Sequence, residues 1–111
     1  WATFILSYWH RDQGLYSIQE AVRRISAMPA NVLDLEDRGT LVVGKRADLN
    51  VFDIDRLEER MPEIVYDFPF GAPRFIQHAV GYKATVCNGQ VVLQDDELTG
   101  ERSGRILRRR K

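Results

Sequence analysis

The sequence has 111 residues, which is the size of one ordinary domain or of part of one. Its apolar fraction of 44% is enough for a hydrophobic core and too high for a disordered chain. The 16 basic and 16 acidic side chains cancel, so the net charge provides no general attraction to nucleic acids or membranes. No apolar run approaches the roughly 20 residues of a membrane span, and no signal peptide is expected.

The cysteine content bears on the cellular compartment of the protein, and the first residue bears on whether the sequence is complete. Cys87 is the only cysteine, so it has no partner for an internal disulfide. A free thiol suits a reducing compartment, and we therefore expect a cytoplasmic protein. Because the sequence begins with Trp1 and not with methionine, we expect it to have been cut, trimmed or only partly supplied.

The first helical pattern covers residues 1–12. Aromatic and aliphatic side chains recur there near helical spacing, and Gly14 provides a plausible end. His10 lies within this pattern, but no histidine, cysteine or carboxylate stands at a ligand spacing from it. We therefore interpret His10 as a surface or packing residue.

A second helix is predicted to begin at Ser17. Ser17 and Glu20 form a Ser-x-x-Glu capping box, in which each side chain can bind a free backbone N–H of the first turn. Pro29 halts or kinks this helix, and a short helix over residues 30–35 should follow. The apolar stripe of the second helix consists of Ile18, Ala21, Val22, Ile25 and Met28.

Residues 37–53 form the most ordered motif of the chain: Asp-Arg-Gly-Thr-Leu-Val-Val-Gly-Lys-Arg-Ala-Asp-Leu-Asn-Val-Phe-Asp. Gly39 and Gly44 allow positive φ angles without steric cost. The pattern predicts a short extended piece at residues 41–43, a tight turn, and then a half-buried strand over residues 47–54.

The next two segments are predicted to lie on the surface. Residues 55–63 mix acidic and basic side chains, which is typical of a solvated turn or of one helical turn. Residues 66–75 contain two prolines and a glycine, which exclude a helix and a central strand. We expect a loop that its aromatic side chains hold in place: Phe68, Phe70 and Phe75.

Arg74 is the one residue of this loop with an obvious binding chemistry. Its planar guanidinium can bind a carboxylate through two parallel hydrogen bonds. Arg74 is therefore a candidate substrate-binding residue, and the alternative is an ion pair that closes the loop.

The clearest hairpin is predicted over residues 80–93. Alternating side chains flank Asn88-Gly89, the favoured pair for a type I′ turn. Cys87 precedes this turn and is expected to pack as a small apolar residue. A nucleophilic role for Cys87 needs a nearby base, for which His78 is the only candidate.

The carboxy-terminal tail concentrates basic charge. Residues 101–111 hold six basic side chains and one acidic one, which leaves ten basic and fifteen acidic side chains in residues 1–100. The tip, Arg108 to Lys111, could bind phosphates electrostatically, but no aromatic residue is interleaved for base stacking. We favour a solvated terminus that lies on the acidic remainder, and we consider nucleic-acid binding unlikely.

The order of these residues resembles the metal-dependent amidohydrolases, and within them the branch that deacylates N-acyl-D-amino acids. The family pattern D-R-G-x-L-x-x-G-x-x-A-D-L-x-V-x-D is filled by residues 37–53. Residues 67–74 are similar to the D-x-P-x-G-A-x-R segment of that branch. Residues 99–105 match its closing T-G-x-x-x-G-R, with Ser103 where proline is frequent. The family commonly has glycine where Asp34 stands.

The resemblance implies an α+β fold that is the carboxy-terminal portion of a larger enzyme. Residues 1–36 would be the helical segment that ends a (β/α)₈ barrel. Residues 37–111 would be a β-rich part of a small composite β-sandwich, ending in a β-hairpin. The parent enzyme would use one or two zinc ions to activate water against an amide C–N bond that is not a peptide bond.

The residues of the chain itself do not supply this chemistry. Zinc needs three protein ligands and an open position, whereas His10 and His78 stand alone and no His-x-His pair occurs. We therefore predict no catalytic residue, no metal ligand and no cofactor in this chain, with zinc implied only for the full-length family. Whether the protein is an enzyme remains open, and the chain by itself is predicted to be inactive and structural.

Three interpretations follow from the sequence. The first is the fragment described above, whose partner would be the missing catalytic barrel and whose uncovered strands would favour a homodimer. The second is a free-standing homo-oligomeric binding module. The third is a binder of acidic partners or nucleic acid through the basic tip. The substrate acyl group, the amino acid and the metal count are not determined by these residues.

Overall fold

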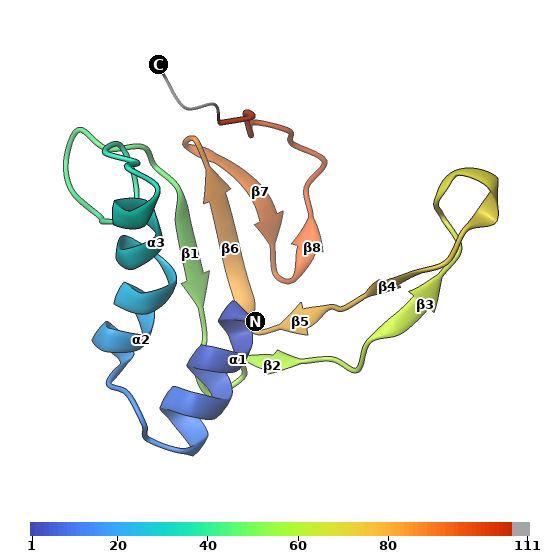
Figure 1. Cartoon of the computed structure of the whole chain (residues 1–111), viewed down its shortest axis with the longest axis horizontal. Coiled ribbons are helices and arrows are strands. Elements are labelled where there is room, and N and C mark those ends of the chain that lie inside the picture. Colours follow the sequence, from blue (N-terminus) through green and yellow to red (C-terminus); the bar gives the residue numbers. More distant parts are fainter. Residues whose placement is uncertain (108–111) are drawn as a thin grey trace.

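A computed structural model describes residues 1–107, in which the helices lie beside one edge of an antiparallel sheet and a long arm projects away from both (Figure 1). Helix α1 (Ala2–Phe4) continues directly into the π-helix η1 (Ile5–Asp12). Helices α2 (Ile18–Ile25) and α3 (Ala27–Val32) follow. None of these helices is long and apolar enough to cross a membrane.

The main sheet has four antiparallel strands in the order β1-β6-β7-β8. Strands β6 and β7 form a hairpin, and β1 pairs with the other side of β6. The expected α+β class is confirmed. The bounds of these strands are β1 Leu49–Phe52, β6 Tyr82–Cys87, β7 Gln90–Gln94 and β8 Glu97–Leu98.

Residues 58–80 form the arm, which consists of two short antiparallel ladders in succession (Figure 1). At its base β2 pairs with β5, and in its outer half β3 pairs with β4. A 3₁₀ turn at Pro69–Gly71 closes the tip. The bounds of the arm strands are β2 Glu58–Glu59, β3 Glu63–Val65, β4 Arg74–Ile76 and β5 Ala79–Val80.

The start of α2 is as predicted, but its end is not. The Ser17 hydroxyl accepts the backbone N–H of Glu20 at 3.2 Å, which is one half of the capping box. The Glu20 carboxylate instead accepts hydrogen bonds from Arg23 and Arg24. These bonds, and most of all the one from Arg23, lower the pKa of Glu20 to about 2. The break falls at Ser26 and not at Pro29, because proline is tolerated in the first turn of α3, where its missing N–H has no partner to lose.

Two predictions within residues 37–63 need correction. Residues 41–43, predicted as a short extended piece before a tight turn, lie outside any strand, and the side chain of Val43 is fully exposed. The strand is limited to β1, four residues within the predicted range 47–54. The charged run is not uniformly solvated, because Leu57 within it is completely buried.

The core joins the helices to the sheet. Its buried residues are Ile5 and Leu6 of η1, Ala21 of α2, and Leu57 from the turn that precedes the arm. Partly buried side chains of β1 and β6 pack against it, including Phe52 and Tyr82. The helical segment and the β-rich segment therefore share one core.

The hairpin between β6 and β7 is confirmed. Its central residues Asn88 and Gly89 have φ angles of 52° and 82°. Both values are positive, as a type I′ turn requires.

This geometry predicts the effect of changing Gly89. A β-branched residue is strained at a positive φ, so Gly89→Val should lower the free energy of unfolding by about 1 kcal/mol or more. Urea denaturation monitored by tryptophan fluorescence measures this loss. Val91→Ala, in the same hairpin but at a negative φ, is the control, and equal midpoints for wild type and Gly89→Val would contradict the turn assignment.

The aromatic residues of the loop do not hold it in place, which corrects the prediction. Phe68, Phe70 and Phe75 are all exposed, and Phe75 belongs to β4. The arm extends away from the helices and from the main sheet, and these side chains stay exposed at its outer end (Figure 1).

Candidate functional site

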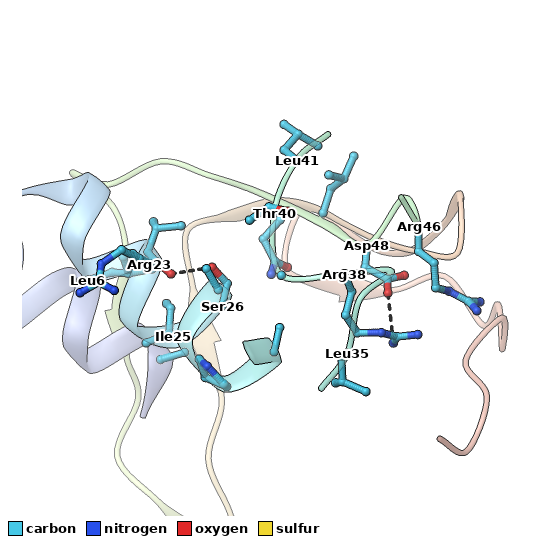
Figure 2. A pocket seen from close by; sticks show the side chains of 18 of the residues that line it. Leu6, Arg23, Ile25, Ser26, Leu35, Arg38, Thr40, Leu41, Arg46 and Asp48 are labelled. Carbon is cyan, nitrogen blue, oxygen red and sulfur yellow. Dashed lines mark hydrogen bonds and ion pairs between the residues drawn. The ribbon is translucent and has the colours of Figure 1, made fainter. Parts of the chain in front are cut away.

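The Asp-Arg-Gly motif forms an ion-pair cluster beside the helices. Arg38 donates to both carboxylate oxygens of Asp37, at 2.9 and 3.2 Å. Its Nη1 also lies 3.5 Å from Oδ2 of Asp48 (Figure 2). The hydrogen bond from Arg38 holds the pKa of the Asp37 carboxyl below its usual value. Arg38 therefore joins the beginning of the 37–53 motif to Asp48, directly before β1.

The same motif binds the hairpin turn. Oδ1 of Asp48 accepts the backbone N–H of Asn88 at 2.7 Å, and the carbonyl of Ala47 accepts the N–H of Gly89 at 2.9 Å. Arg46 donates to Oδ1 of Asn88 at 2.7 Å. These contacts hold the β6–β7 turn against the entry of β1, so the polar residues of the motif act structurally here.

An apolar groove of about 760 Å³ is lined by residues of both the helices and the sheet (Figure 2). Helices η1, α2 and α3 line it together with strands β1 and β6, and residues 38–41 also contribute to the lining. The apolar lining includes Leu6, Val22, Ile25, Ala30, Leu33, Leu49 and Phe52, and the charged rim consists of Arg23, Arg38, Arg46 and Asp48.

Strand β1 borders this groove and is an edge of the sheet. It pairs with β6 on one side only, and no other strand within residues 1–107 pairs with its outer side. An unpaired edge next to an apolar groove is a surface on which another strand can add.

The candidate binding residue Arg74 is engaged within the arm. Its guanidinium donates to both carboxylate oxygens of Asp67, each at 2.6 Å, and lies 5.5 Å from the centre of the Phe68 ring. The bond from Arg74 lowers the pKa of the Asp67 carboxyl. The structure thus contains the loop-closing ion pair, while a contact of Arg74 with substrate stays a prediction.

The remaining candidate residues lie on separate elements. Nδ1 of His10 is 2.8 Å from the carbonyl of Tyr16, whereas His78 is near Glu63 at 3.7 Å in the arm. Cys87 is at the end of β6, where its carbonyl accepts the Ser103 hydroxyl at 2.6 Å. Among residues 1–107, no group of three or more histidine, cysteine or acidic side chains could hold a metal ion. These residues therefore do not supply the three protein ligands that a zinc site needs.

The basic tip, Arg108 to Lys111, lies outside the described part of the chain. Phosphate or nucleic-acid binding by the tip therefore stays a prediction.

Sequence reasoning missed three residues that position these elements. Leu57 gave no signal of burial, because it lies in a charged run beside other residues, such as Met61, that are exposed. Gly81 has a φ of 99°, and a Cβ there would lie 2.8 Å from the backbone of Leu57. The carboxylate of Asp96 accepts the N–H groups of Gly81 and Tyr82, at 3.0 and 2.7 Å. The pair Asp95-Asp96 was the available signal, since aspartate tolerates the positive φ that both residues adopt.

Comparison with known families identifies the class of protein. The profile of the amidohydrolase family matches residues 2–93, which include the helices, the groove and all of the arm. The chain belongs to this family.

The similarity extends to particular enzymes within the family. N-acyl-D-glutamate deacylase of Alcaligenes xylosoxydans xylosoxydans is 36% identical, over 98% of this chain and 21% of that protein. D-aminoacylase of the same organism is 35% identical, again over 98% of this chain and 21% of that protein. The chain therefore spans about a fifth of the length of these relatives.

A solved structure agrees with the sequence comparison. A D-aminoacylase structure, concerned with the role of that enzyme's binuclear metal center, superposes with a TM-score of 0.76 at 29% identity. The superposition covers 97% of this chain and 21% of that chain. The chain is thus homologous to one segment of D-aminoacylase.

Proposed function

We propose that the chain is the carboxy-terminal portion of a zinc-dependent amidohydrolase that removes acyl groups from N-acyl-D-amino acids. The observation that carries the proposal is a match over nearly the whole chain to only a fifth of two such enzymes. In this proposal the helices end the catalytic barrel, and the strands belong to a composite β-sandwich. We also propose a cytoplasmic location for the protein, because the thiol of Cys87 would stay reduced there.

The role of this portion is structural. The described residues supply no group that fits a metal ion, so no catalytic step is assigned to them. The shared core holds the helices on the sheet, and the Asp37–Arg38–Asp48 cluster ties the segment that follows α3 to the residue before β1. In a complete enzyme this would hold the end of the barrel on the sandwich.

A chimera tests the proposal. We would replace the matching segment of the Alcaligenes N-acyl-D-glutamate deacylase with this chain and measure amine release from N-acetyl-D-glutamate in the presence of zinc. The chimera is expected to retain turnover, whereas the isolated chain should show none above a zinc blank. A folded but inactive chimera, or turnover by the chain alone that is lost in His10→Ala or His78→Ala, would contradict the proposal.

We also propose that the isolated chain forms a homodimer. The unpaired edge of β1 and the adjacent apolar groove favour association, because a second copy can cover both through a two-fold contact. Sedimentation at micromolar concentrations measures the state, and a monomer across a wide dilution range would contradict this interpretation. Val51→Lys, which adds a charge to β1, should weaken the dimer, while Leu98→Lys on β8 is the control.

A further inference from the structure

The outer half of the arm is an isolated ribbon of two strands. Its base is tied to the core, where the carboxylate of Glu59 accepts the N–H of Phe4 at 3.1 Å. Beyond this point, among residues 1–107, β3 and β4 pair only with each other. A two-stranded ribbon is marginal by itself in water, yet six large apolar side chains of this arm are more than half exposed: Met61, Ile64, Tyr66, Phe68, Phe70 and Phe75.

Phe70 at the tip is the most exposed of these residues. Its side chain is fully exposed, and its backbone is left-handed, with φ 63° and ψ 20°. A bulky residue in this region is strained, and such strain persists only where the surroundings or a partner compensate for it. No burial within the described chain offsets the cost.

The loop around Phe70 is braced on both sides. The bidentate pair between Arg74 and Asp67 closes it, and the N–H of Gly71 donates to the carbonyl of Phe68 at 3.0 Å. Pro69 restricts the backbone directly before Phe70. A braced loop that presents a fully exposed aromatic side chain at its tip has the features of an interface anchor, because bracing reduces the conformational entropy to be lost on binding.

The comparison with D-aminoacylase indicates what covers the anchor. The superposition includes 97% of this chain, so at most a few residues are left out and the arm must be part of it. The same segment therefore occurs within a chain about five times as long. In that setting the additional four-fifths of the fold are available to cover the arm.

We propose that the arm docks on the remaining, catalytic part of an amidohydrolase chain, with Phe70 buried in that part as the anchor. This inference rests on the proposed function and adds to it a defined surface and a defined residue. The arm is then the element that fastens this portion to the barrel, separately from the groove and the edge of β1.

The variant Phe70→Gly tests this proposal because it should act in opposite directions in two settings. In the isolated chain, glycine relieves the left-handed strain, so the thermal midpoint should rise by on the order of 4 °C. In the deacylase chimera, the same change removes a buried anchor, so the midpoint should fall by on the order of 2 °C or more.

Asp95→Gly is the matched control. Asp95 is also exposed and left-handed, with φ 46°, but it lies in the β7–β8 turn outside the arm. Its replacement should raise the midpoint in both settings.

Three results would overturn the proposal. A chimera in which Phe70→Gly raises the midpoint, as Asp95→Gly does, would show that the arm stays exposed, even if turnover is intact. Loss of a dimer of the isolated chain on Phe70→Gly would assign the arm to a second copy. A chimera that does not fold would show that the chain does not fit the amidohydrolase remainder. The docking proposal is tested by thermal midpoints and by sedimentation, whereas the proposed function is tested by turnover. The failure of one proposal can therefore be distinguished from the failure of the other.

Discussion

Gly39→Ala is expected to lower the free energy of unfolding by about 3 kcal/mol. Gly39 has a φ of 84°, and a Cβ at this position would lie 2.4 Å from the Cβ of Ala30 and 3.2 Å from the carbonyl oxygen of Ser26. The substitution therefore combines backbone strain with an overlap against helix α3. Chemical denaturation in urea, with the slope compared between variants, measures the loss.

Two further variants separate these causes. Gly44→Ala has a similar φ of 94° but no atom within 4 Å of the added Cβ, so it should cost only about 1 kcal/mol. Ala30→Gly removes the atom that is approached most closely, so the double variant with Gly39→Ala should regain part of the loss in a double-mutant cycle. Equal losses for Gly39→Ala and Gly44→Ala would show that the close approach of the motif to α3 is wrong.

Leu57→Ala is expected to destabilise the chain by about 2–5 kcal/mol. Leu57 is fully buried and joins the helical and β-rich segments in the shared core. Its truncation removes apolar burial and leaves a cavity where Gly81 brings the backbone of the sheet close. The thermal and urea midpoints should both fall.

Met61→Ala is the control for this variant, because Met61 lies in the same charged run but is 86% exposed. Its truncation in the isolated chain should change stability by no more than about 0.5 kcal/mol. Similar effects of the two substitutions would contradict the placement of Leu57 in the core.

The sequence by itself determined the features that depend on neighbouring residues. Ser17 begins α2 because a hydroxyl at that position binds a free N–H of the first turn. Asn88-Gly89 forms the turn because these residues tolerate positive φ. The ordered motif from residue 37 to residue 53 was also sufficient to indicate the amidohydrolase family, which the family profile confirms.

Only the tertiary structure decided which apolar residues are buried. Leu57 and the aromatic residues of the arm, such as Phe70, occur in equally irregular stretches, yet the first is buried and the second is exposed. Local pattern could not separate them, because burial depends on which distant segment approaches. Gly81 lies directly beside the backbone of Leu57, in the core. Phe70 is in the arm, which extends away from the core (Figure 1).

The tertiary structure also decided which partners the charged residues bind. The guanidinium of Arg74 could bind the carboxylate of a ligand or of a neighbouring residue, and the fold places the Asp67 carboxylate 2.6 Å from it. Arg38 and Asp48 are ten positions apart and meet only because the chain turns back between them. Side-chain chemistry sets what each of these residues can bind, and the path of the backbone selects the partner.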